Sequence, residues 1–144
     1  MSVTYTNNWK NILTALKSKI RAEMKCPVFS GFDETSKANQ FIRLIPTGSA
    51  QLEKASFMET REYNINCQYL FIRRNNAQFQ DYVLNQVSIL EALVHDNITL
   101  TLADSTRALD VTLGTMTFDV EIDEYEDYFA VEWEFSCIHS GNMA

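Results

Sequence analysis

At 144 residues, with 46% hydrophobic and 12% aromatic residues, the chain has the size and composition of one globular domain over residues 1–144. No apolar run approaches the roughly 20 residues that a membrane-spanning helix needs, and the start MSVTYTNNWK has no signal-peptide core. We therefore expect synthesis in the cytoplasm and no membrane partner.

The charge is divided unevenly along the chain. Residues 1–107 hold all 12 basic residues and ten acidic ones, whereas residues 108–144 hold nine acidic residues and no basic one. A net charge of −7 with this distribution speaks against a tight grip on duplex DNA, which needs clustered Lys and Arg. It favours a surface that attracts or repels a charged partner.

The first half of the chain predicts two helices and two strands. Apolar residues at three- and four-residue steps predict an amphipathic helix over residues 8–24, capped by a residue of the segment 6–8. Residues 27–40 are rich in Ser, Gly, Asp and Asn and predict a loop. A short strand in QFIRLIP ends at a turn formed by Pro46 and TGS, and a long alternating strand covers residues 62–71. A second helix is expected over residues 77–94, with Tyr82 in its buried stripe.

The second half predicts three more strands. The segment NITLTLA alternates, with Ile98, Leu100 and Leu102 on one face. In residues 109–122 the apolar positions are odd before Gly114 and even after it, as a β-bulge at that glycine would produce. This phase turns Leu109 and Phe118 toward the core.

The last strand, over residues 129–137, would bury Trp133 and Phe135. The expected fold class is α+β, with one mostly antiparallel sheet of about five strands and two helices packed on one face, in the order α-β-β-α-β-β-β.

The hairpin expected over residues 112–137 carries eight carboxylates and no Lys or Arg. On the expected strands these carboxylates point away from the apolar residues and face one another across strands, which costs some tenths of a kcal/mol per pair. The acidic sheet face comprises Asp119, Glu121, Asp123, Glu132 and Glu134. Four interpretations stay open: a solvated face that blocks edge aggregation, a divalent-cation site, a surface facing a polyanion such as DNA, and a docking face for a basic partner.

The sequence carries no catalytic motif such as GxSxG, HExxH, a Walker loop or a Rossmann fingerprint. Cys26, Cys67 and Cys137 lack metal-site spacing, and the last two fall on the apolar phase of expected strands, which favours small buried hydrophobes. We expect no enzyme activity, no cofactor and no metal. A metal-dependent hydrolase is the alternative that clustered carboxylates leave open.

The order of elements resembles that of tail terminator and tail-completion (head–tail joining) proteins of tailed phages. In that family a Glu precedes an alternating strand that leads into the second helix, and Glu62, Ile65, Cys67, Tyr69 and Phe71 match this pattern. The resemblance covers most of the chain and rests on pattern and topology.

The resemblance implies a virion protein of the neck or tail that forms a ring, commonly a hexamer, stops growth of the tail tube and joins the tail to the head. Its partners would be further copies of itself, the tail-tube protein and a head-completion or connector protein, with DNA passing through an acidic lumen without specific binding. The acidic sheet face is the lumen candidate. The candidates for subunit contacts are the basic residues Lys17, Arg21, Arg73 and Arg74. A head-completion or neck protein, or an intracellular module that recruits a basic partner, are the alternatives.

Overall fold

The computed structural model describes residues 7–24, 26–30, 38–54, 58–96, 99–102, 107–122 and 125–142. Helix α1 spans Asn8–Met24, as the sequence predicts. The side-chain oxygen of Asn7 accepts a hydrogen bond from the backbone N–H of Lys10 at 3.0 Å, so Asn7 is the cap. One stripe of α1, with Ile12, Leu16 and Ile20, is buried.

Helix α2 spans Gln78–Asp96 and follows its expected bounds within two residues. Val83, Val87, Leu90 and Val94 form its buried stripe. The expectation for Tyr82 was wrong, because this side chain is 46% exposed and its hydroxyl donates a hydrogen bond to the side-chain oxygen of Gln40.

Within the described residues, seven strands form one sheet, rather than the expected five or so. They are β1 (Val28–Ser30), β2 (Gln40–Lys54), β3 (Met58–Ile72), β4 (Leu100–Thr101), β5 (Arg107–Leu113), β6 (Thr117–Phe118) and β7 (Tyr128–Asn142). Their order across the sheet is β1-β2-β3-β7-β5-β4, with β6 also paired to β7. All pairs are antiparallel except β1 with β2, so the expected mostly antiparallel sheet is confirmed.

The predicted turn at Pro46 was wrong. Strand β2 continues through Pro46 to Lys54, and its register with β3 shifts between Pro46 and Gly48 and again between Gln51 and Glu53. Bulges tolerate a proline that has no N–H to donate, so the residues that favour a turn instead bend a long strand. Strand β1 lies in the segment expected to be a loop, where three residues pair with Ile42, Arg43 and Leu44 of β2.

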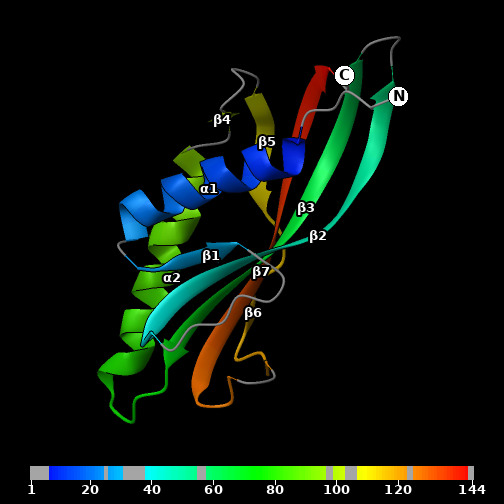
Figure 1. The fold of residues 1–144 in the computed structure, drawn as a ribbon. Coiled ribbons are helices and arrows are strands. Elements are labelled where there is room, and N and C mark those ends of the chain that lie inside the picture. Colours follow the sequence, from blue (N-terminus) through cyan, green and yellow to red (C-terminus); the bar gives the residue numbers. More distant parts are fainter. Residues whose placement is uncertain are drawn as a thin grey trace.

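Both helices pack on the same face of the sheet, as predicted (Figure 1). Trp133 and Phe135 are buried under them, at 1% and 2% exposure, which confirms the phase predicted for the last strand. Cys67 and Cys137 belong to the same buried cluster, so the interpretation as small hydrophobes is confirmed.

The opposite face of the sheet is not bare, contrary to expectation. Tyr125 packs there against Phe41, Leu70 and Ala130 in a second, smaller core. The aromatic rings of Tyr125 and Phe41 lie 5.3 Å apart between their centroids. The segment between β6 and β7 thus covers one end of the face predicted to be a field of carboxylates.

The register against β7 slips by one residue twice in the acidic half: at Asp110, and again between Leu113 and Thr117, where the sequence predicts a slip at Gly114. Asp110 has a φ of 51°, and the register between β5 and β7 shifts between Leu109 and Thr112. Ala108 and Val111 are buried as a result, while Leu109 is 43% exposed. At Gly114 strand β5 has ended, and the Gly114 N–H donates to the Glu134 carbonyl at 2.7 Å.

Candidate interaction surfaces

The outer sheet face, which is the face away from the helices, carries a hydrogen-bonded chain that ends on Glu132. Arg43 of β2 donates from Nη1 to Oε1 of Gln68 at 3.1 Å. Gln68 and Asn66 of β3 then both donate to Oε2 of Glu132, at 3.0 and 3.1 Å. The arginine also lies 5.4 Å from the ring centre of Tyr125, so that the outer core and the polar chain meet at Arg43.

The expected repulsion between carboxylates across strands is not observed among the described residues. Glu132 lies opposite Gln68 on β3 and opposite Thr117 on β6. Glu134 lies opposite Asn66 on β3. Amide side chains of β3, placed by the register, therefore face the acidic side chains of β7 and donate hydrogen bonds to one of them.

The predicted acidic face is divided into parts by this arrangement. Glu132 and Glu134 remain together on β7, where they line a hollow of about 540 Å³ with Asn66 and Thr117. Glu121 is exposed but lies after β6, in a segment that is not a strand. Asp123 lies outside the described residues.

Asp119 leaves the acidic face altogether and pairs with Arg73. The two side chains form an ion pair, and Asp119 has a φ of 55°, which places it in a sharp turn directly after β6. The Arg73 guanidinium also lies 5.5 Å from the ring centre of Phe129. The backbone N–H of Arg73 donates a hydrogen bond to the Asp127 carbonyl at 3.0 Å. A predicted lumen residue and a predicted subunit-contact residue thus hold each other within one chain.

A pocket of about 700 Å³ opens beside this ion pair, at the start of α2. Its walls come from α2, β6, β7 and the residues before α2: Arg73, Arg74, Asn75, Phe79, Gln80, Val83, Leu84, Phe118 and Phe129. Phe118 is 44% exposed and Leu84 is 41% exposed. The expectation that Phe118 faces the core was wrong because β6 is only two residues long and places the ring at this opening.

The other two predicted contact residues, Lys17 and Arg21, lie on α1. Arg21 is exposed and Lys17 is half-buried. Neither lines the pocket beside Arg73 and Arg74.

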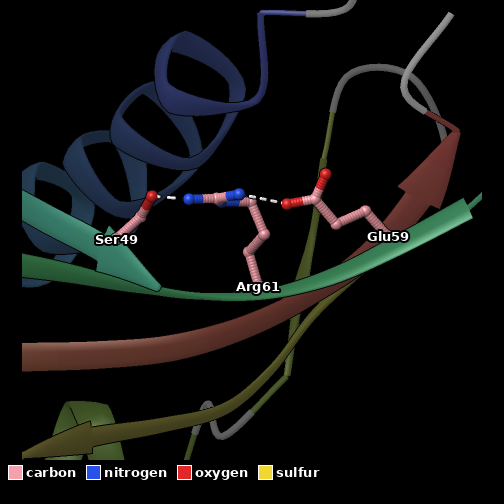
Figure 2. Close-up of polar contacts among 3 residues, drawn as sticks. All are labelled: Ser49, Glu59 and Arg61. Atoms are coloured by element: carbon pink, nitrogen blue, oxygen red, sulfur yellow. Dashed lines mark hydrogen bonds and ion pairs between the residues drawn. The ribbon is translucent and has the colours of Figure 1, made fainter. Parts of the chain in front are cut away.

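The helix-covered face of the sheet carries a polar group that the sequence pattern did not lead us to predict (Figure 2). Arg61 of β3 forms an ion pair with Glu59 and donates from Nε to the Ser49 hydroxyl at 3.1 Å. Glu59 and Arg61 stand two residues apart on the strand face that carries Tyr63, which strand alternation alone would have indicated.

The thiols are positioned as packing groups. Burial raises the pKa of the Cys67 thiol, and burial followed by the charge of Glu62 raises the pKa of Cys137 to about 12. Burial also raises the pKa of Cys26. Within the described part of the chain, no three His, Cys, Asp or Glu side chains lie close enough together to hold a metal ion.

Among the described residues, neither helix is long and apolar enough to cross a membrane. No family model and no curated protein sequence matches the chain.

The fold does match solved structures over almost the whole chain. A chain of the virion of a native gene transfer agent (GTA) particle aligns with a TM-score of 0.64 at 12% sequence identity, covering 94% of this chain and 98% of that one. A second solved structure aligns with a TM-score of 0.60 at 11% identity, covering 96% and 99%. The chain therefore shares its fold, over 94% of its length, with a component of a virion.

Proposed function

We propose that this protein is a structural component of a tailed virion, which forms a ring at the end of the tail tube and joins the tail to the head. The observation that carries the proposal is the fold shared, over 94% of this chain, with a chain of the GTA virion. The order of elements, which resembles that of tail terminator proteins, supports the same role. A ring of six 16.6 kDa chains would weigh about 100 kDa.

In this ring the outer sheet face would line the channel for DNA. Exposed Glu134 and Glu121 would repel the phosphate backbone, so that a duplex slides past without binding. The hydrogen bonds from Asn66 and Gln68 to Glu132, and from Arg43 to Gln68, would keep this part of the sheet face rigid and lower its net negative charge. The partners would be the tail-tube protein on one side and a head-completion or connector protein on the other.

Deleting the gene from the genome that encodes the particle tests the proposal. A tail terminator is expected to give tails of uncontrolled length that do not attach to heads. A head-completion or neck protein, which is the runner-up, would instead give tails of normal length beside heads that lose DNA. Electron microscopy of the particles separates these results, and normal infectious particles lacking the protein would contradict both.

The other candidate function is that of an intracellular module that recruits a basic partner. The observation that favours it is that Glu132 and Glu134 line the same hollow. This function predicts a partner whose affinity falls with salt and falls again when both residues become Gln. Binding that the double substitution leaves unchanged would remove this candidate.

A further inference from the structure

The pocket beside Arg74 has the composition of a docking site. Five large apolar side chains are exposed among the described residues, and two of these, Leu84 and Phe118, line this one pocket. A third, Tyr82, lines an adjoining hollow that shares Arg74 and Phe79 with it. Exposed apolar side chains gathered in this way mark surfaces that another chain covers.

The charge at the pocket rim limits which kind of protein segment can bind in the pocket. Arg73 is already engaged by Asp119. Arg74 is exposed, and within the described residues no carboxylate pairs with it. The rim therefore offers one guanidinium next to an apolar hollow, which suits an apolar side chain followed closely by carboxylates.

We propose that the occupant is the segment 31–37 of a second copy of this chain, with Phe32 as the anchor in the pocket and Asp33 and Glu34 on Arg74. This inference rests on the ring proposed above. The chain has two places where an aromatic residue is followed by two carboxylates, at Phe32 and at Tyr125. Tyr125 is 7% exposed within the outer core, which leaves Phe32.

The described residues on both sides of the segment are held by other strands. Ser30 pairs with Leu44 of β2, and the Ala38 carbonyl accepts a hydrogen bond from the Tyr128 hydroxyl at 2.7 Å. Pocket and segment are different parts of the chain, so the contact is head-to-tail and repeats from copy to copy, which is the kind of contact that closes into a ring.

Photo-cross-linking of the full chain tests the contact. Phe32 is replaced by benzoylphenylalanine, and both concentrated purified protein and intact particles are irradiated. We expect a product of twice the chain mass whose cross-linked peptide contains Leu84 or Phe118. The control places the same photo-reactive residue at Leu52, which is 52% exposed on β2, and is expected to give no cross-link to that peptide.

A charge reversal adds a second readout. The Arg74→Glu variant should lower the yield of the doubled product on the order of tenfold, because it places like charges together at the rim. Reversing Asp33 and Glu34 to Arg in the same chain should restore the yield. Arg107→Glu, an exposed arginine on β5 outside the pocket, is the matched control and should leave the yield unchanged.

Three outcomes would overturn the inference: a cross-link to the same peptide without doubling of mass, a cross-link of Phe32 to a different protein, and a doubled product that maps outside the pocket. Each of these leaves the proposed function standing if the protein is found in particles. Absence from particles would overturn the proposed function, while a doubled product in purified protein would still support the contact.

Discussion

Glu132 shows how a crowded acidic strand is accommodated one side chain at a time. Its carboxylate accepts hydrogen bonds from Asn66 and Gln68, and Gln68 accepts one from Arg43. Hydrogen bonds to a charged group contribute about 1.5–3 kcal/mol each. Alternation along the strands predicts which face each of these residues occupies, but not that they meet, because Asn66 and Gln68 are 66 and 64 residues away from Glu132 along the chain.

A double-mutant cycle measures this coupling. Gln68→Ala and Glu132→Ala should each destabilise the protein, and the cycle should give a coupling of about 0.5–3 kcal/mol because the two side chains share a hydrogen bond. Chemical denaturation of the four proteins supplies the free energies of unfolding. The control cycle of Gln68→Ala with Asp81→Ala, an exposed residue of α2 on the other side of the sheet, should be additive within about 0.5 kcal/mol. Equal coupling in both cycles would show that the contact does not exist.

The helices and strands differ in how well their own sequence predicts them, without knowledge of the segments that they contact. Both helices follow from the sequence because a stripe at three- and four-residue steps is repeated over several turns. Strand β1 does not, since three residues carry no period and become a strand only by pairing with β2. Strand β2 was cut short at Pro46, because residues that favour a turn also occur in bulges, and only the partner strand decides between the two.

The bulge in β5 gives a test at this scale. Asp110 has a φ of 51°, a conformation that Asp tolerates better than a β-branched residue does. Asp110→Val should therefore lower the free energy of unfolding by about 1–3 kcal/mol, whereas Asp110→Gly should be neutral or stabilising. Thr112→Val, at an exposed position on the same strand, is the control and should change stability by less than about 0.5 kcal/mol. A tolerated valine at position 110 would contradict the bulge.

The whole molecule has an alkaline limit that follows from its core. Burial raises the pKa of Cys67, of Cys137 and of Tyr69 above their ordinary values. Unfolding exposes these groups, and above their ordinary pKa the unfolded chain then gains charge that the folded chain does not. For Cys137, this stabilisation is complete below pH 9.0 and is lost as the pH rises toward about 12.

We therefore expect the urea concentration at the unfolding midpoint to decrease as the pH rises from 9 toward about 12. The measurement is urea unfolding at several pH values, monitored by the fluorescence of buried Trp133. The variant Cys137→Ala lacks one of the titrating groups and should show a smaller fall over the same range. A midpoint that does not change with pH would mean that the thiols are accessible in the folded protein.

At this scale the sequence predicts the layers but not the arrangement of the strands. Strand phase places the helices on one face, and the structure confirms this. The position of β7 between β3 and β5 depends on contacts between segments that are distant in the sequence. The surface on which each acidic residue lies depends on the same contacts. Asp119 was placed on the wrong surface for this reason, since the chain turns after β6 and carries it to Arg73.

Strands β2, β3 and β7 are each 15 residues long, and β3 is paired with β7 from Met58 to Ile72 and with β2 from Glu59 to Phe71. Such strands extend for about 50 Å, whereas α1 and α2 cover only about 25–30 Å each, and the strand ends run on past α1 (Figure 1). Hydrogen bonds between antiparallel strands lie across the strand direction. A pull along β3 would therefore load its two ladders in shear, so that many bonds resist together, whereas a pull across the sheet would open them one after another like a zip. The molecule is mechanically strongest along one axis, and a joint under tension gains most when that axis follows the load.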